Sequence, residues 1–205
     1  MRLLGGDRER RGTPADLLVV GLGNPGEQYA RTRHNVGAEV VALLAERGGA
    51  ALKRSKERAL TAEVTRSGKR LALAFPQTFY NESGSAARLL IRRYGIDDPH
   101  RVVVVHDELD LPPGTIRVKL GGGLAGNNGL KSVKAHLNTD DFVRIRIGVG
   151  KPPGSRQGAD HVLRPPGKAE RVELDIAIHE AADAVERIAA DGVDAAMNRH
   201  NTRGA

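Results

Sequence analysis

The fold class is decided by a run of four β-branched residues, Val102-Val103-Val104-Val105, which continues directly into His106-Asp107-Glu108. Continuous apolar runs are typical of strands buried on both faces, whereas a half-exposed strand alternates apolar and polar residues. Polar side chains that follow such a strand lie at its carboxyl end, where open α/β sheets bind their ligands. The sequence therefore predicts a covered sheet with its chemistry at one edge.

Strand and helix patterns alternate on both sides of this run. We expect further strands over 16–20, 60–65, 70–75, 115–120 and 142–149, and helices over 36–47, 82–94, 129–137 and 169–190. In the last strand, apolar residues alternate with Arg144 and Arg146, which predicts outward arginines. The predicted class is α/β, a single domain with a mixed β-sheet flanked by helices. Residues 1–15 lack periodicity and predict a disordered N-terminal extension to a domain over 16–205.

Composition narrows the possible functions. The 205 residues include 32 Lys and Arg against 25 Asp and Glu, a formal charge of +7, and no cysteine. The absence of cysteine excludes disulfides, thiolate metal sites and a cysteine nucleophile. A pI near 10.0 favours a polyanionic partner. No apolar run has the length of a membrane span and residues 1–15 contain no apolar signal core, so we expect a soluble, cytoplasmic protein.

Two glycine-rich segments are candidate ligand loops. Gly21-Leu22-Gly23-Asn24-Pro25-Gly26 matches a dinucleotide-binding pattern, but polar residues separate it from the next helix, which argues against a cofactor there. Residues 121–129, which contain Asn127-Asn128, open a helix, and their backbone amides are suited to an oxygen anion or a phosphate. The seven histidines form no HxH or HExxH pair, so the sequence predicts no metal site.

General-base chemistry has one candidate pair. His34 precedes a predicted helix in a loop at the expected ligand edge, and Asp107 ends the buried strand at the same edge. An imidazole oriented by a carboxylate is a suitable base near neutral pH. Without a G-x-S-x-G motif water is the expected nucleophile, and Ser83, at the start of a predicted helix, is a minor alternative. Asn24, Asn81 and Asn128 lie in separate loops of that edge, and an amide there can donate to an oxyanion while accepting from water.

Basic residues concentrate in residues 48–70 and 144–168. Such runs are usually solvated surface, but two of them in a strongly basic chain make a phosphate-binding surface plausible.

Several long segments together resemble bacterial peptidyl-tRNA hydrolase. The segments are Val19 to Gly26, Tyr29 to Gly37, Phe79 to Gly84, His106 to Gly114, Gly121 to Lys131, Arg144 to Gly150, Val162-Leu163 and Asn198-Arg199. The resemblance implies an enzyme that hydrolyses the ester between a peptide and the 3′ ribose of tRNA, and so recycles tRNA dropped from the ribosome. It also implies a monomer without cofactor or metal, whose partner is peptidyl-tRNA.

The resemblance also assigns residues to roles. It implies His34 as the catalytic base, Asp107 as its support and Asn24 as a group that helps orient the water or the base. The implied substrate-binding positions are Tyr29, Tyr80, Asn81 and Asn128. The implied clamp for the tRNA 5′ phosphate is Lys119 with Arg146.

The chain departs from the family pattern at two places. Tyr80 stands where the family usually has Met, and Leu124 to Asn127 replaces a stretch that is commonly Gly-rich and ends in His. Because of these departures, the sequence does not determine the shape of the peptide channel. Two other functions fit parts of the sequence: a non-catalytic RNA-binding relative of the same fold, and a dinucleotide-binding oxidoreductase that uses residues 21–26.

Overall fold

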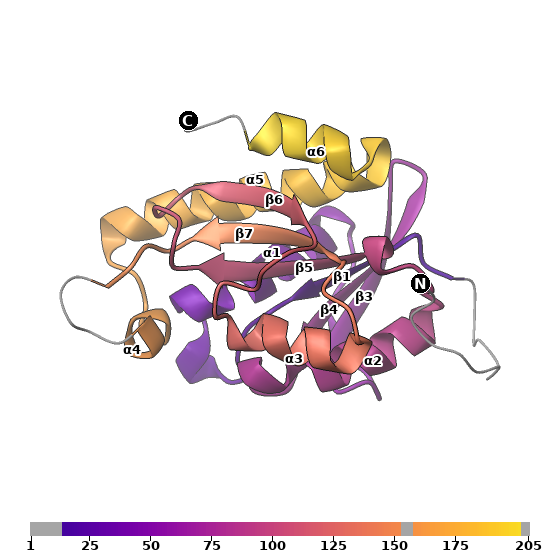
Figure 1. Ribbon diagram of the computed structural model, residues 1–205, viewed down its shortest axis with the longest axis horizontal. Helices are drawn as coiled ribbons and strands as arrows, with labels where there is room; N and C mark the ends of the chain where they lie inside the picture. The colour runs from indigo at the N-terminus through magenta and orange to yellow at the C-terminus, as the bar shows by residue number, and fades with distance from the viewer. Residues whose placement is uncertain (1–13, 153–157, 202–205) are drawn as a thin grey trace.

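The computed structural model describes residues 14–152 and 158–201. A single seven-stranded sheet in the order β2-β3-β4-β1-β5-β7-β6 forms the middle layer of the described chain (Figure 1). The strands are β1 (Leu17–Gly21), β2 (Lys53–Arg54), β3 (Ala59–Arg66), β4 (Lys69–Pro76), β5 (Val102–Glu108), β6 (Ile116–Leu120) and β7 (Val143–Gly148). The helices are α1 (Val36–Arg47), α2 (Ser83–Tyr94), α3 (Asn128–Leu137), α4 (Gly158–Val162), α5 (Lys168–Asp191) and α6 (Val193–His200). The α/β class and the single mixed sheet are as predicted.

The centre of the sheet is parallel and its flanks are antiparallel. β1 lies between β4 and β5 and is parallel to both, and β7 extends the parallel set beside β5. β3 and β6 pair antiparallel with β4 and β7. The carboxyl ends of β4, β1, β5 and β7 therefore meet at one edge of the sheet, which is where an open α/β sheet places its site.

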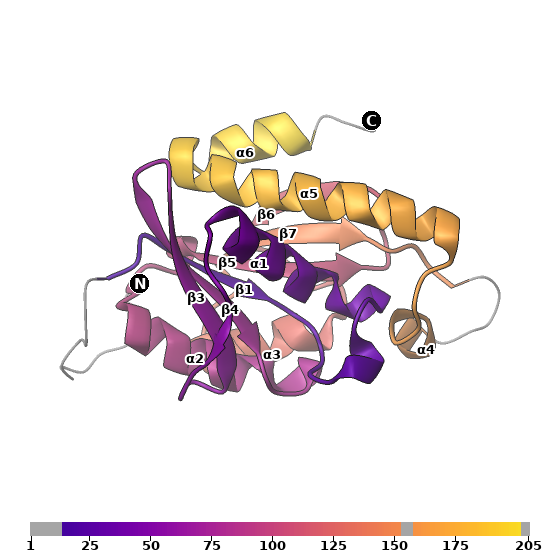
Figure 2. The same cartoon turned by 180° about the vertical axis from the view of Figure 1, so that it is seen from behind.

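Two apolar cores cover the two faces of the sheet. On one face, Val19, Val103 and Ile145 pack with α1, α5 and α6, whereas Val20 and Val104 face the core under α2 and α3. Figure 2 shows α1 and α5 along the first face, and Figure 1 shows α2 and α3 on the opposite side. Successive valines of β5 thus enter different cores, which explains why the run has no polar member.

The predicted elements are present, with small shifts of their ends. The helix over 36–47 matches α1, and the predicted hairpin is β3 and β4. Gly95 and Gly192 end α2 and α5 with positive φ, the backbone conformation that glycine adopts without strain. The short β2, α4 and α6 were not predicted. The predicted disordered extension falls mainly on residues 1–13, which lie outside the described residues, whereas the Ala15 amide donates to the Tyr94 carbonyl at 3.0 Å.

The prediction that Arg144 points outward is wrong. Its side chain is buried, with 1% of the residue exposed. The guanidinium donates to the carbonyl oxygens of Gly121, Gly122 and Gly123, with the Gly123 contact at 2.7 Å. A buried charge needs several acceptors, and the loop after β6 supplies them. Arg144 thus fixes the start of the loop that leads to α3.

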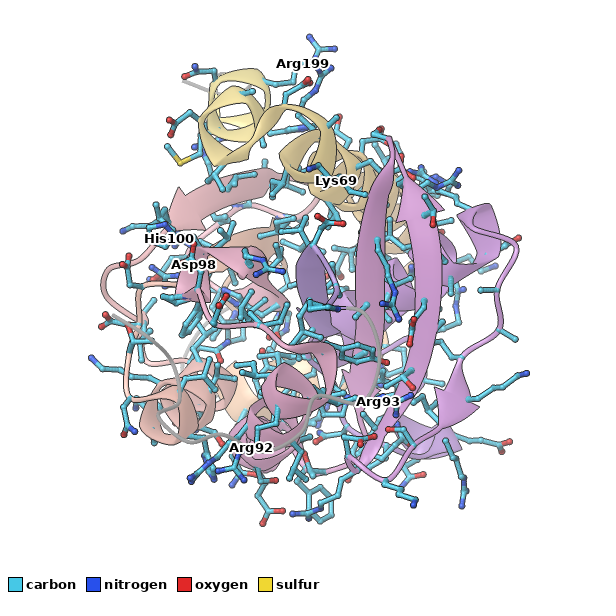
Figure 3. The ribbon with its side chains drawn as sticks, turned by 90° about the vertical axis from the view of Figure 1, so that its right-hand side faces the viewer. Lys69, Arg92, Arg93, Asp98, His100 and Arg199 are labelled. Atoms are coloured by element: carbon cyan, nitrogen blue, oxygen red, sulfur yellow. The ribbon has the colours of Figure 1, made fainter. Side chains whose placement is uncertain are left out.

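The end of α2 is tied to the antiparallel flank by Arg93, labelled in Figure 3. Its guanidinium donates to Glu57 at 2.6 Å and lies 5.1 Å from the centre of the Tyr94 ring. This contact anchors the segment between β2 and β3 at the side of the sheet.

Within the described chain, no helix combines the length and the apolar character that crossing a membrane requires.

Candidate active site

A cleft of about 700 Å³ opens at the carboxyl ends of the parallel strands. Its walls come from the loop after β1, the segment between β4 and α2, the end of β5, the start of α3, and α4. Seven residues predicted for the site line it, namely Asn24, Tyr29, His34, Tyr80, Asn81, Asp107 and Asn128. Segments far apart in the sequence therefore converge on one cavity.

The loop after β1 is fixed by a pair of asparagines. Asn35 accepts from the Asn24 backbone N–H through Oδ1 and donates to the Asn24 carbonyl through Nδ2, both at 2.9 Å. The Asn24 side-chain oxygen accepts from the Tyr80 backbone N–H at 2.8 Å. Because its oxygen is taken, Asn24 has its amide nitrogen left for a ligand. Sequence reasoning did not single out Asn35, although it directly follows His34.

His34 and Asp107 form the polar centre of the cleft. His34 Nδ1 lies 3.0 Å from both carboxylate oxygens of Asp107. The His34 side chain is 16% exposed and that of Asp107 only 4%, so the imidazole is the more accessible member of the pair. A carboxylate can only accept, so Nδ1 carries a proton and the lone pair of the neutral ring is on Nε2. This arrangement can take a proton from a water molecule.

Tyr80 supports both members of this pair. Its ring is stacked on the His34 imidazole, with centroids 3.5 Å apart and an angle of 13° between the planes. Its hydroxyl donates to Asp107 Oδ1 at 2.7 Å and accepts from Asn127 Nδ2 at 3.0 Å. Sequence reasoning placed Asn127 in a candidate ligand loop and noted it as a departure from the family pattern, but no local signal in the sequence indicated this contact.

The electrostatics of the centre favour an ionised Asp107. Burial by itself raises the pKa of Asp107, but the His34 ring and the hydrogen bonds from His34 and Tyr80 bring the pKa below its usual range. Burial and the Asp107 charge raise the pKa of Tyr80 well above its ordinary value, so the phenol stays protonated. Burial lowers the pKa of His106, which keeps that neighbouring ring neutral. The N-termini of α1, α2 and α3 also lie at this edge, where their dipoles favour negative charge.

The outer wall of the cleft depends on Arg33. Its guanidinium pairs with Glu170 at 2.5 Å and donates to the carbonyl oxygens of His161, Arg164 and Pro165 at 3.0–3.3 Å. Val162 and Leu163 of that segment line the cleft. Arg33 thus holds α4 against the site from the residue next to His34. The α4 wall and the exposed Phe79 at the rim were not predicted as site residues.

Lys119 and Arg146 lie apart from this cleft. The β6–β7 register pairs Arg117 with Arg146 and Lys119 with Arg144, so these four side chains share one face of the strand pair. Lys119 is exposed, and Arg146 donates to Glu108 at 3.0 Å. Since Glu108 lines the cleft, this basic face borders the site through the end of β5.

The glycines of residues 21–26 have a packing role. A Cβ on Gly21 would overlap the Gly37 carbonyl oxygen, so the two glycines allow β1 and α1 to touch. α1 begins only at Val36, ten residues after Gly26, whereas a dinucleotide site opens its helix within the glycine motif. Within residues 14–152 and 158–201, no group of three or more His, Asp or Glu side chains is arranged to hold a metal ion.

Comparisons with known proteins agree with a hydrolase site on this fold. The family model described as peptidyl-tRNA hydrolase matches residues 18–205. A peptidyl-tRNA hydrolase of Leifsonia xyli is 50% identical over 189 residues, which cover 91% of this chain and 97% of that protein. One from Rhodococcus erythropolis is 49% identical and covers 89% and 96%. A crystal structure of the peptidyl-tRNA hydrolase from Acinetobacter baumannii is similar with a TM-score of 0.85 and 36% identity, over 94% of this chain and 98% of that chain.

An α/β sheet with a His–Asp pair and amides around one cleft is an arrangement suited to a hydrolase that activates water. The chain belongs to the peptidyl-tRNA hydrolase family, and it is an enzyme of that class.

Proposed function

We propose that the chain hydrolyses the ester between the peptide and the 3′ ribose of peptidyl-tRNA, with His34 as the general base and Asp107 as its support. The observation that carries this proposal is the contact of His34 Nδ1 with both oxygens of Asp107 at 3.0 Å, inside the cleft at the carboxyl ends of the parallel strands, in a chain of this family. Nε2 removes a proton from water, the resulting hydroxide attacks the ester carbonyl, and the 3′ oxygen leaves with a proton returned by the imidazolium.

The asparagines around the cleft supply neutral hydrogen bonds to this reaction. The Asn24 amide nitrogen donates to the attacking water or to the developing oxyanion, since its oxygen is held by the Tyr80 backbone. Asn81 and Asn128 are exposed at the starts of two helices and position the peptide and the 3′-terminal nucleoside. Tyr29 lines the same cavity and closes its side.

The basic face of β6 and β7 holds the tRNA away from the chemistry. Lys119 and Arg146 clamp the 5′ phosphate, and their shared face next to Glu108 supports this role. A contact that is equal in the ground state and the transition state lowers KM without raising kcat. We also propose that the enzyme is a monomer of 21.9 kDa that acts in the cytoplasm, which light scattering and cell fractionation can test.

The base is tested by the release of tRNA from an N-blocked aminoacyl-tRNA in the presence of EDTA. His34→Ala should lower kcat by about three orders of magnitude or more while retaining tRNA binding. His100→Ala is the matched control, since that ring is exposed and pairs with Asp141 on another part of the surface (Figure 3). Turnover of His34→Ala close to the wild type would exclude His34 as the base. Binding of tRNA without any cleavage by the wild type would favour the non-catalytic RNA-binding alternative.

The clamp is tested with tRNA that carries or lacks a 5′ phosphate. The double variant Lys119→Ala/Arg146→Ala should raise KM about tenfold or more for the phosphorylated substrate, with kcat within about threefold. It should also lose the preference for the phosphate. Lys69→Ala removes one positive charge from the hairpin turn and serves as the control (Figure 3). An unchanged preference in the double variant would exclude the clamp.

A further inference from the structure

We infer that the Tyr80 hydroxyl, oriented by Asn127, is a positioning group for the base: it fixes the Asp107 carboxylate and limits how strongly that carboxylate pulls on the His34 ring. Tyr80 touches the machinery without occupying the place of the substrate, because one ring face is covered by His34 and the residue is only 4% exposed. The inference rests on the proposed function of His34 and Asp107. We refer to Tyr80 and Asn127 as the Tyr80–Asn127 relay.

Tyr80 is held from several sides before it meets His34. Its backbone N–H donates to Asn24 at 2.8 Å and its carbonyl accepts from the Ser83 hydroxyl at 2.9 Å. Its ring fills the space beside Gly129, where a Cβ would overlap the ring carbons. The ring has little freedom to turn, so the position of the hydroxyl is set by the fold.

The direction of each hydrogen bond in the relay follows from the start of α3. Asn127 caps this helix, and its Oδ1 accepts from the Leu130 backbone N–H at 3.0 Å. The amide nitrogen must then face the opposite way, toward the Tyr80 hydroxyl. That hydroxyl oxygen accepts from Asn127, so its single proton is available for Asp107 Oδ1 at 2.7 Å. All hydrogen bonds of the relay therefore point the same way, from the Leu130 backbone N–H through Asn127 and the Tyr80 hydroxyl to Asp107.

At Asp107 the relay competes with His34. Oδ1 accepts both the Tyr80 O–H and a share of the His34 Nδ1–H, and Oδ2 accepts the rest. Two donors of fixed position allow one carboxylate orientation. The Tyr80 bond also takes up part of the negative charge, which weakens the support that Asp107 gives to a protonated His34 ring. The other titratable groups beside Asp107 are His106, whose Nδ1 contacts the Asp107 carbonyl, and Glu108, which pairs with Arg146.

The relay makes a prediction about pH that a purely structural tyrosine does not. Tyr80→Phe retains the ring but removes the hydroxyl. Asp107 then supports the imidazolium more strongly, so the midpoint of the acid limb of the kcat/KM profile should move upward by about half a pH unit to one unit, the effect of one ordinary hydrogen bond. KM should stay within about twofold. A structural role would lower activity equally at every pH, in parallel with a lower melting temperature.

Asn127→Ser is the second variant, because serine still caps a helix but is too short to reach the Tyr80 hydroxyl. It should shift the acid limb in the same direction by a smaller amount. In the double variant Tyr80→Phe/Asn127→Ser the shift should equal that of Tyr80→Phe alone, since Asn127 acts through the hydroxyl. Acid limbs of Tyr80→Phe and the wild type that coincide, or shifts that add fully in the double variant, would overturn the inference.

A spectroscopic readout separates this inference from the proposed function. In ¹⁵N-histidine-labelled protein, the His34 Nδ1 proton resonance should move downfield in Tyr80→Phe, because the bond to Asp107 strengthens when its competitor is lost. If Tyr80→Phe does not fold, Asn127→Ser gives the same measurement with a smaller shift. A downfield shift together with full activity of His34→Ala would preserve the relay and refute the base. An unchanged resonance together with an inactive His34→Ala would refute the relay and support His34 as the base.

Discussion

Replacing Asp107 by asparagine should lower kcat by about two to four orders of magnitude with little change in KM. The substitution preserves the shape of the side chain but exchanges one acceptor for a donor. In the wild type, Asp107 accepts from the Tyr80 hydroxyl at 2.7 Å and from His34 Nδ1 at 3.0 Å. An asparagine keeps an acceptor at only one of the two oxygen positions. With its oxygen in place of Oδ1 it accepts from Tyr80, but its amide nitrogen then takes the place of Oδ2 and faces His34 Nδ1, whereas the flipped side chain turns the amide nitrogen toward Tyr80.

The size of the expected decrease in kcat depends on which donor, the Tyr80 hydroxyl or His34 Nδ1, loses its acceptor. If the new oxygen accepts from His34, the amide nitrogen faces the Tyr80 hydroxyl, which already receives the Asn127 amide, and its proton is buried without an acceptor. Such a loss costs about 1–3 kcal/mol, so the opposite arrangement is preferred by a factor of about 5–150. That arrangement turns the amide N–H toward His34 Nδ1, which favours the tautomer that carries its proton on Nε2. In that tautomer Nε2 has no lone pair with which to take a proton from water. Loss of the carboxylate charge beside the imidazolium should lower kcat by about a further tenfold to hundredfold.

The assay is single-turnover release of tRNA from an N-blocked aminoacyl-tRNA at saturating enzyme. Asp110→Asn is the matched control, because that carboxylate is exposed and pairs with Lys151 at 2.8 Å outside the cleft. The control should cleave within about twofold of the wild type, as expected for an exposed ion pair. A rate for Asp107→Asn within tenfold of the wild type, in a variant with an unchanged circular dichroism spectrum, would refute the reasoning from the tautomer.

Three further predictions concern the surroundings of the site. Arg33→Lys loses the forked contact with Glu170 and should lower the free energy of unfolding by about 1–3 kcal/mol. Because α4 is then less well held, KM should rise several-fold with kcat retained, and an unchanged KM would contradict this. Arg144→Met leaves three carbonyls without their donor and should cost about 2–3 kcal/mol in urea unfolding, whereas an unchanged midpoint would show that the loop is held by other contacts. Burial lowers the pKa of His106, so its contribution to stability is complete above about pH 6.5 and is lost as the pH falls. The melting temperature of His106→Gln should therefore fall less between pH 7 and pH 5 than that of the wild type. An equal fall in melting temperature for both proteins would contradict this contribution of His106.

The sequence was sufficient for the order of most elements, though not for β2, α4 and α6, and for the edge that carries the site. The valine run of β5 indicated a doubly covered strand, and the ends of parallel strands must meet, so His34 and Asp107 could be expected at the same edge. The fate of the Arg144 side chain could not be expected, because alternation in a strand assigns faces but does not say what covers them. Here the carbonyls of residues 121–123 fold over the arginine and bury it.

The Tyr80 contacts show a different limit of sequence reasoning. Tyr80 and Asn127 both depart from the usual family residues, and each departure taken alone left the shape of the peptide channel open. In the structure they touch each other at 3.0 Å. A contact between residues 47 positions apart depends on how α3 packs against the segment before α2, and no local pattern encodes that distance.

The separation of His34 from Asp107 is set by backbone packing. Gly37, in the first turn of α1, lies so close to β5 that a Cβ would overlap the Val105 carbonyl oxygen. The same carbonyl accepts from the Leu22 amide at 2.9 Å, and the Leu22 carbonyl accepts from the Ala38 amide at 3.1 Å. These contacts join the end of β1, the start of α1 and the end of β5 at one point. His34 lies three residues before Gly37, and Asp107 two residues after Val105. The glycines that imitate a cofactor motif therefore bring the helix close enough for the imidazole to reach the carboxylate.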